Sequence, residues 1–174
     1  STGIDTLSPV HRIDRDTAGL VLFAKQPSGR APYQALFRER QVDKVYECIA
    51  PWNPNLAWPL TRTSRLAPAE HFMQQTEVPG TPNAITRIEP TEINDTLARY
   101  CLRPLTGQRH QLRVHMAALG LPIVNDGIYP VLTAQGTADF TRPLQLLARS
   151  LAFIDPLSGQ RLEFESRLAL ADWN

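Results

Sequence analysis

The chain has 174 residues, of which 43% are hydrophobic, enough for one domain with its own core and too few for two ordinary domains. Its formal net charge of +1 lacks the basic surplus that marks many nucleic-acid-binding proteins, although charge can also be concentrated locally. The sequence contains neither an N-terminal apolar signal region nor a run of about 18 apolar residues, so secretion and membrane spanning have no support and a cytoplasmic protein is expected.

A charged segment opens the chain. Residues 11–19 read HRIDRDTAG and lead into the apolar run 20–24, which is short enough for a strand buried on both faces. Residues 31–40 are expected to form a helix, because apolar side chains recur there at i, i+3 and i+4. Residues 44–50 alternate with the period of a strand. Lys44 and Tyr46 would therefore point the same way.

The middle of the chain is rich in proline. Residues 51–83 contain six prolines, so irregular structure with short edge strands at most is expected there. Residues 84–88 and 97–102 are expected to pair as an antiparallel hairpin.

The C-terminal part predicts one helix and a second hairpin. Apolar side chains recur at helical spacing over residues 108–119, where a following glycine and proline supply a stop. Strands over 144–154 and 161–166 flank a turn at 155–159. Because strands come mostly as adjacent hairpins, the pattern favours an α+β fold with a mostly antiparallel mixed sheet flanked by a few helices.

Residues 97–120 hold four arginines and two histidines but no acidic residue, which predicts a local basic face. A zinc site is not expected. His110 and His115 are five residues apart, about 140° around a helix, whereas the helical zinc motif needs two histidines four apart. Cys48 and Cys101 lie outside any CxxC spacing and are typical of core residues in a reducing compartment.

Three motifs occur in a fixed order. They are HRIDRDTAG at residues 11–19, KVY at 44–46, and PLTGQRHQLRVHMAALGLPIVNDGIYP at 104–130. Together they resemble the RluA family of RNA pseudouridine synthases, whose signatures are close to HRLDxxTSG, KxY and PLTGRTHQIRVH followed by GDxxYG. The resemblance runs from residue 11 to about residue 130 and weakly on to the final hairpin. It implies an isomerase that converts specific uridines of ribosomal or transfer RNA to pseudouridine.

The resemblance also implies roles for single residues. Asp14 would be the essential catalytic residue, Tyr46 would lie against the target uracil, and Arg113 would form an ion pair with the catalytic carboxylate. An adjacent guanidinium favours the ionised form that a carboxylate nucleophile needs, and it can grip the carboxylate with two hydrogen bonds. No cofactor, metal or obligatory protein partner is expected. Asp16 falls on a variable position and is expected to be a solvated charge.

An RNA substrate would need cationic contacts beside the pocket. The target nucleotide has to leave the base stack, which costs a few kcal/mol that stacking on an aromatic ring can partly offset. Five side chains are candidates for contacts to phosphates or base edges: Arg12, Arg15, Lys44, Arg109 and His110.

The sequence departs from the family pattern at a few positions. Ala18 replaces the usual Ser, Gln108 and Arg109 stand where Arg and Thr are common, and Leu147 replaces a usual His. The first motif begins ten residues from the start of the chain, whereas relatives carry strands upstream of it. Residues 1–174 are therefore expected to form a single catalytic domain that lacks its N-terminal strands or upstream region.

Two alternatives remain at this point. The chain could be a catalytically inactive RNA-binding relative, given the moved charge and the missing His. It could also be a glycoside hydrolase that uses Asp14 and Asp16 as its carboxylate pair, since both reactions break a glycosidic bond.

Overall fold

The computed structural model describes residue 3 and residues 5–133 and 141–171. Twelve elements make up this part of the chain, in the order β1 (Ser8–Pro9), β2 (Ala18–Gly19), β3 (Phe23–Ala24), α1 (Pro27–Arg38), β4 (Asp43–Pro51), β5 (Leu60–Pro68), β6 (Gln75–Val78), β7 (Ala84–Ile93), β8 (Leu97–Pro104), α2 (Gln111–Ala118), β9 (Leu146–Ile154) and β10 (Arg161–Glu165). Neither helix of the described residues is long and apolar enough to cross a membrane.

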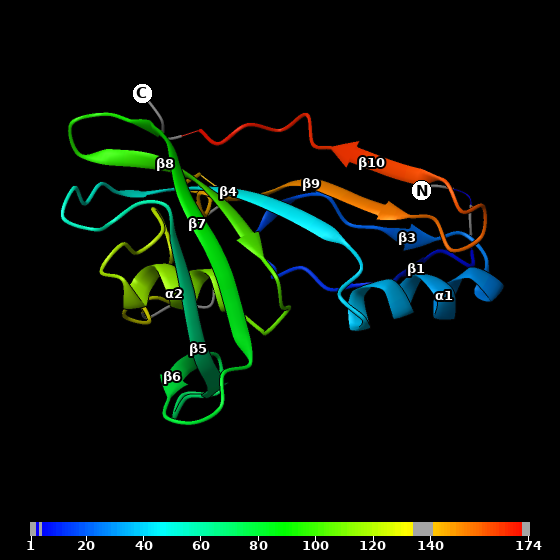
Figure 1. The fold of residues 1–174 in the computed structure, drawn as a ribbon, viewed down its shortest axis with the longest axis horizontal. Helices are drawn as coiled ribbons and strands as arrows, with labels where there is room; N and C mark the ends of the chain where they lie inside the picture. Colours follow the sequence, from blue (N-terminus) through cyan, green and yellow to red (C-terminus); the bar gives the residue numbers. More distant parts are fainter. Residues whose placement is uncertain (1–2, 4, 134–140, 172–174) are drawn as a thin grey trace.

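One large sheet dominates the molecule (Figure 1). Its strand order is β10-β9-β4-β8-β7-β5-β6, with β2 paired to β9 at the side, and β1 and β3 form a separate two-stranded sheet. All neighbours along this order are antiparallel, whereas β2 and β9 are parallel. The α+β class with a mostly antiparallel mixed sheet is therefore confirmed.

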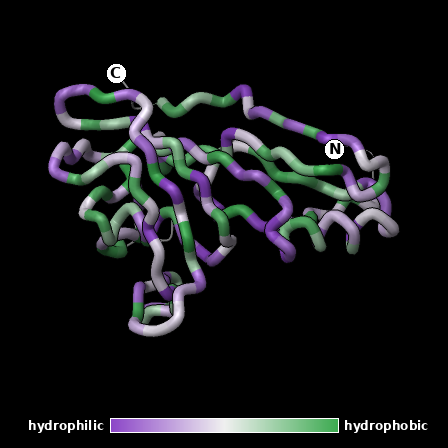
Figure 2. The backbone as a smooth tube through the Cα atoms, in the orientation of Figure 1, coloured by the Kyte–Doolittle hydropathy of each residue, from purple (hydrophilic) through white to green (hydrophobic). Residues whose placement is uncertain are grey.

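Both helices cover the same face of the sheet. Leu112 and Met116 of α2 pack with Cys48 of β4 in one hydrophobic cluster. Leu36 of α1 packs with Leu151 of β9 in another. The strand register places Leu151 beside the start of β4 and Leu146 beside Cys48, on one face. Figure 2 shows predominantly hydrophobic colour along β9, which runs through both clusters.

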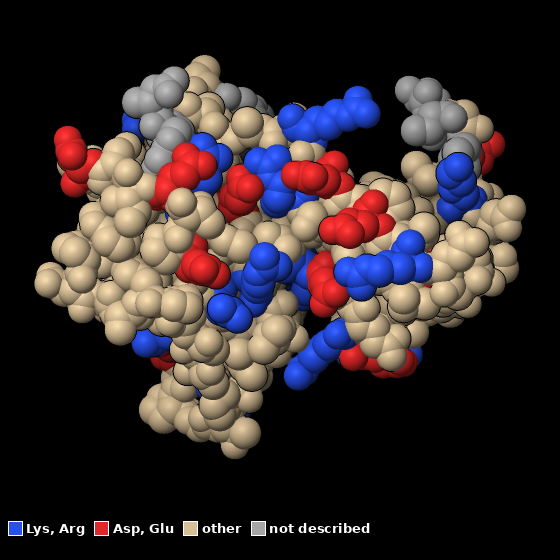
Figure 3. Space-filling model, turned by 45° about the horizontal axis from the view of Figure 1, so that its top comes forward, with Lys and Arg blue, Asp and Glu red and all other residues tan. Residues whose placement is uncertain are grey.

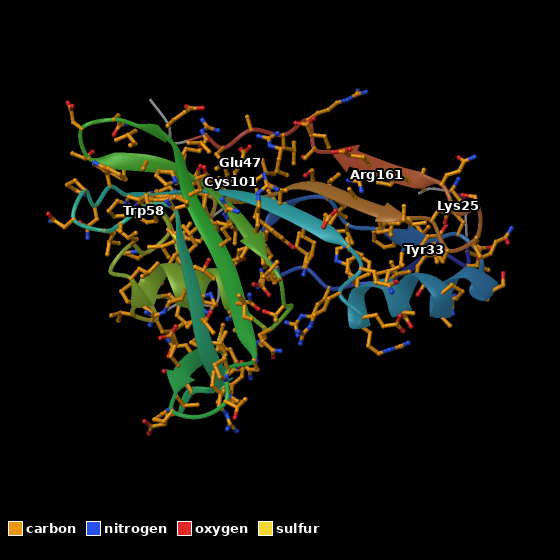
Figure 4. All side chains as sticks on the ribbon, in the orientation of Figure 1. Lys25, Tyr33, Glu47, Trp58, Cys101 and Arg161 are labelled. Carbon is orange, nitrogen blue, oxygen red and sulfur yellow. The ribbon has the colours of Figure 1, made fainter. Side chains whose placement is uncertain are left out.

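Helix α1 is tied to the far end of the sheet by a hydrogen bond. The hydroxyl of Tyr33 donates to Oδ1 of Asp155 at 2.5 Å, in the turn between β9 and β10. Figure 4 labels Tyr33 on α1 where the helix faces the strands. The helix begins at Pro27, earlier than the predicted residue 31, because Pro is well suited to the first helical turn. Arg40 then takes the left-handed conformation and turns the chain into β4.

The prediction of one strand over residues 20–24 is wrong in part, because only Phe23 and Ala24 belong to a strand, β3. The chain here makes two short pairings in different sheets, β2 with β9 and β3 with β1. The physical reason is the change of sheet at Gly19, whose φ is +107° and whose backbone passes so close to Ala148 that a Cβ would lie 2.3 Å from the carbonyl oxygen. Phe23, expected to be buried, is 44% exposed.

The expectation for residues 51–83 is also wrong in part. Strand β5 is a regular nine-residue strand that pairs with both β6 and β7. Prolines do not interrupt it, because Pro59 lies just before β5 and Pro68 is its last residue. In Figure 1 the β5 and β6 strands extend beyond the rest of the sheet. The predicted hairpins at 84–102 and 144–166 are confirmed, with longer strands in the first.

Candidate active site

A cavity opens on the helix-covered face between α1 and α2. Its volume is about 310 Å³, within the range of small-molecule sites, and so sufficient in size for a nucleobase. The first motif, β4, the loop before α2 and α2 itself all contribute to its wall. The lining side chains relevant to chemistry are His11, Arg12, Asp14, Lys44, Tyr46, Gln108 and Gln111. The three sequence motifs thus meet at one cavity.

The first motif is held in place by His11. Its ring stacks on Phe37 of α1 at 4.3 Å between centroids. The backbone N–H of Leu22 donates to Nε2 at 3.0 Å, so this nitrogen carries no proton, and Nδ1 donates to the Arg12 carbonyl at 3.2 Å. Burial lowers the pKa of His11, in keeping with this neutral form. The histidine therefore fixes the backbone just before Asp14.

Asp14 lies three residues after His11 in the first motif, with a side chain that is 15% exposed. A turn closes behind it, in which the Thr17 N–H donates to the Asp14 carbonyl at 3.0 Å. Two cationic or potentially cationic groups approach the same carboxylate oxygen, Oδ1. They are Arg12 Nη2 at 3.7 Å and His110 Nε2 at 3.9 Å.

Tyr46 and Lys44 both line the cavity, which confirms that they share one face of β4. Burial, with a smaller contribution from the charge of Asp14, raises the pKa of Tyr46 to about 12. Its phenol is therefore protonated at neutral pH. Lys44 Nζ donates to the Thr106 carbonyl at 3.0 Å, and burial lowers the pKa of this amine.

Arg113 does not form the expected ion pair with Asp14. Its Nε and Nη2 donate to the two carboxylate oxygens of Asp126 at 2.8 and 2.5 Å, and the two side chains are 2% and 1% exposed. Asp126 also accepts the backbone N–H groups of Ile128 and Tyr129. Asp126 lies in the loop that follows α2, so both of its carboxylate oxygens can contact the Arg113 guanidinium. Asp14 contributes only a longer-range charge that helps to raise the pKa of Arg113.

Asp16 is not simply a solvated charge. Its Oδ2 lies 3.9 Å from Nη1 of Arg113, and its side chain is 33% exposed. Asp16 is not among the residues that line the cavity around Asp14. Its position links the first motif to α2 through Arg113.

The five predicted RNA contacts have different environments. The side chains of Arg12 and Arg15, both in the first motif, are exposed. The guanidinium of Arg109 donates to the carbonyls of Phe72 and Met73 at 3.1 and 3.3 Å and so anchors the loop between β5 and β6. Lys44 is inside the cavity, and His110 is only 8% exposed. His110 therefore exposes little surface for contact with a phosphate.

The predicted basic face over residues 97–120 does not form. Arg99 lies between Glu47 and Glu92, at 3.6 and 3.5 Å, on the face away from the helices. Figure 4 labels Glu47 next to Cys101 there, and the two are partners across β4 and β8. Arg113 and His115 are buried. Figure 3 shows acidic and basic side chains interleaved over the face that it presents.

His110 and His115 face different networks, as their spacing predicts. His115 is bonded to Ser64 through Nε2 at 3.0 Å and to Thr86 through Nδ1 at 2.9 Å. His110 faces Tyr129 and Asp14. Among the described residues, no group of three or more His, Cys, Asp or Glu side chains is placed to hold a metal ion.

Sequence reasoning missed Asp126, Tyr129 and Gln111 as parts of the site. Gln111 accepts from Thr106 Oγ1 at 2.7 Å and from the Gln108 N–H at 3.0 Å, and so shapes the loop at the cavity rim. The signal was present, because all three stand within the long third motif.

Two of the departures from the family pattern are neighbours in space. Ala18 and Leu147 are direct partners in the parallel pairing of β2 with β9. Leu147 is fully buried. A smaller side chain and an apolar one thus lie together beside the segment that contains Asp14.

Solved structures define the class of the fold. Human RNA pseudouridylate synthase domain containing 1 superposes with a TM-score of 0.77 at 23% identity, over 93% of this chain and 69% of that one. Human RNA pseudouridylate synthase domain containing 4 superposes with a TM-score of 0.73 at 24% identity, over 96% and 72%. The chain therefore has the pseudouridylate synthase fold.

Sequence comparisons give the family. The model of the RNA pseudouridylate synthase family matches residues 1–118. The dual-specificity RNA pseudouridine synthase RluA of Escherichia coli is 32% identical over 163 residues, 90% of this chain and 71% of that protein. An uncharacterized RNA pseudouridine synthase of Haemophilus influenzae is 34% identical over 120 residues, 69% of this chain and 53% of that protein. The chain belongs to the RNA pseudouridylate synthase family and spans about half to three quarters of these relatives.

Proposed function

We propose that this protein isomerises uridine to pseudouridine in RNA, with Asp14 as the essential catalytic residue. One observation carries the proposal: Asp14 and Tyr46 line the same cavity, which is large enough for a nucleobase. The family membership supports the reaction class, and E. coli RluA is named as a dual-specificity RNA pseudouridine synthase. We propose ribosomal or transfer RNA as the substrate.

The reaction requires one bond to break and another to form. The bond between ribose C1′ and uracil N1 is cleaved, the uracil is turned while it is held, and C1′ is joined to C5. C5 then loses its proton and N1 gains one, so no cofactor or external energy source is needed. The Asp14 carboxylate supports cleavage either by attack or by stabilising positive charge on the sugar.

Tyr46 would act in its protonated form. A phenol whose pKa is raised to about 12 is a poor source of phenolate at neutral pH. It can nevertheless stack on uracil and present a hydroxyl group to the ring. Lys44, held on the Thr106 carbonyl at the cavity wall, can contact the flipped nucleotide without an exposed position.

Arg12 and Arg15 remain the candidates for contacts to the RNA backbone. Both are exposed, and both flank Asp14 in the first motif. Contacts to phosphates position an RNA without reading its sequence, and the flipped base is then recognised inside the pocket.

The alternatives are less well supported by the geometry. A hydrolase with two carboxylates would need Asp16 in the cavity beside Asp14, but Asp16 is turned toward Arg113. An inactive RNA-binding relative would not require Asp14, Tyr46 and the cavity to be kept together.

Pseudouridine mapping across cellular RNA tests the proposal. Cells that carry Asp14→Ala should lose pseudouridine at one or a few sites present in the wild type. Asp95→Ala, which changes an exposed aspartate in the β7–β8 turn, serves as the matched control and should keep those sites. Both variants should accumulate to wild-type levels. Unchanged pseudouridine in the Asp14→Ala cells would reject the proposed catalytic role, and free uracil released by the purified wild type would indicate a hydrolase.

A further inference from the structure

His110 is an unusual residue at the start of α2. It has a left-handed backbone with φ 54° and ψ 17°, a conformation that few residue types tolerate and in which His is enriched. It caps the helix without a side-chain hydrogen bond to the helix backbone. Its ring is instead turned inward, between Tyr129 on one side and Asp14 on the other.

The hydrogen bonds around Tyr129 have a defined direction. The backbone N–H of Gln75 can only donate, and it donates to the Tyr129 hydroxyl oxygen at 2.7 Å. His110 Nδ1 lies 3.0 Å from the same oxygen. Among the described residues the hydroxyl has no other hydrogen-bond partner, so its own proton points to Nδ1. Nδ1 is then an acceptor, and the proton of the neutral ring lies on Nε2.

The protonated Nε2 faces the carboxylate of Asp14. The distance to Oδ1 is 3.9 Å, and a movement of about 1 Å would close it to a hydrogen bond. Catalytic hydrogen bonds are often long before substrate binds and tighten in the complex. Arg12 approaches the same Oδ1 at 3.7 Å. Both contacts fall on one oxygen, and neither occupies Oδ2.

We propose that His110 is a positioning residue for Asp14, and that Tyr129 fixes the His110 tautomer which makes this possible. The chain of contacts runs from the Gln75 N–H through the Tyr129 hydroxyl and the His110 ring to Asp14 Oδ1. The inference rests on the proposed function, because it assumes that Asp14 is the reacting group. It adds His110 and Tyr129 to the residues that support the reaction: His110 orients Asp14, and Tyr129 fixes the tautomer of His110.

Other charged groups face His110 from each side. Burial lowers its pKa most, Arg113 and Arg109 lower it further, and Asp14 and Asp126 act in the opposite direction. The neutral ring is thus favoured at neutral pH, as the chain of hydrogen bonds requires. Tyr129 is itself fixed, because its backbone N–H donates to Asp126 at 3.0 Å and its ring packs 5.6 Å from the Arg113 guanidinium.

The tautomer can be measured without any RNA. In protein with ¹⁵N-labelled histidine, two-bond proton–nitrogen spectra distinguish the nitrogen that carries the proton, and the signal missing from His110→Asn identifies His110. We expect Nε2–H in the wild type and a shift toward Nδ1–H in Tyr129→Phe. A wild-type ring protonated on Nδ1, or a tautomer that Tyr129→Phe leaves unchanged, would overturn the inference.

Single-turnover rates measure the effect on the reaction. The probe is tritium release from unmodified ribosomal and transfer RNA transcripts that carry uridine labelled at C5. His110→Asn should slow release roughly 100-fold, as expected when a reacting group is misplaced by about 1 Å, with RNA affinity unchanged. His110→Gln, which restores a donor near the Nε2 position, should recover roughly 10-fold of this loss.

A double variant separates positioning from structural support. Tyr129→Phe should slow the wild type roughly 10-fold but change the rate in the His110→Asn background by less than about 2-fold, because it acts through His110. Equal losses in both backgrounds, or a wild-type rate in His110→Asn, would overturn the inference. Failure of the wild type itself to release tritium would instead count against the proposed function, while the tautomer measurement would still decide the role of Tyr129.

Discussion

Arg113 and Asp126 form a buried bidentate ion pair, with Nε and Nη2 of the arginine donating to the two carboxylate oxygens. The arginine lies on α2 and the aspartate in the loop that follows it. The pair therefore joins two parts of the third motif, and Asp14 has longer contacts with Arg12 and His110 instead. Asp14 is therefore not held by a bidentate guanidinium, which would occupy both of its carboxylate oxygens.

Breaking this pair should destabilise the fold. Arg113→Met leaves the Asp126 charge buried and should lower the free energy of unfolding by roughly 3 to 5 kcal/mol. Asp126→Asn should cost less, since Asp16 and Asp14 still compensate part of the arginine charge. In urea titrations the double variant should be more stable than the sum of the single losses predicts. Strict additivity would show that the two side chains are not energetically coupled.

Gly19 should resist substitution for two separable reasons. Gly19→Ala forces both a positive φ and a Cβ 2.3 Å from the Ala148 carbonyl oxygen, which would push β2 away from β9. The matched control is Gly159→Ala, where φ is +71° but no atom lies within 4 Å of the added Cβ. The control should cost about 1 kcal/mol in the free energy of unfolding, and Gly19→Ala clearly more. Similar urea midpoints for both would argue against the close approach.

Leu147 and Ala18 should behave as a coupled pair. Leu147→His places an imidazole at a fully buried position beside Ala18 and should lower the free energy of unfolding by roughly 1 to 3 kcal/mol. Adding Ala18→Ser supplies a hydroxyl partner and should recover part of the loss. Chemical denaturation of the four proteins measures this coupling. A double variant no better than the single histidine variant would show that the two positions are independent.

Acid should weaken the protein through His115. Burial lowers the pKa of His115 to about 4, below the 6.5 of an ordinary histidine. The unfolded chain therefore binds a proton more readily, and stability present above pH 6.5 falls as the pH drops toward 4. The contribution reaches at most about 3 kcal/mol. Urea midpoints between pH 7 and pH 4 measure it.

The control for this pH dependence is the exposed His71. His115→Gln should flatten the dependence, leaving a smaller slope because burial also lowers the pKa of His11 and His110. His71→Gln should keep the wild-type slope. An unchanged slope in His115→Gln would mean that His115 is not the titrating group.

The sequence by itself determined the fold class, the hairpins and most of the residues at the cavity. Alternation along β4 placed Lys44 and Tyr46 on one face, since side-chain direction in a strand depends only on local period. The resemblance to the RluA family singled out Asp14 as the residue expected beside them. The proline-rich segment was misjudged because prolines at strand ends are compatible with a nine-residue strand between them.

Only the tertiary structure decided which charges meet. The sequence alone does not determine which carboxylate pairs with Arg113. In the folded protein the loop after α2 places Asp126, and not Asp14, against the guanidinium. The same packing turned His110 inward, where its ring lies between Tyr129 and Asp14. Ion pairs and tautomers depend on distances between segments remote in the sequence, which local periodicity does not encode. The sequence motifs therefore supply the candidate residues of the cavity, and the folded loops determine which group each of them pairs with.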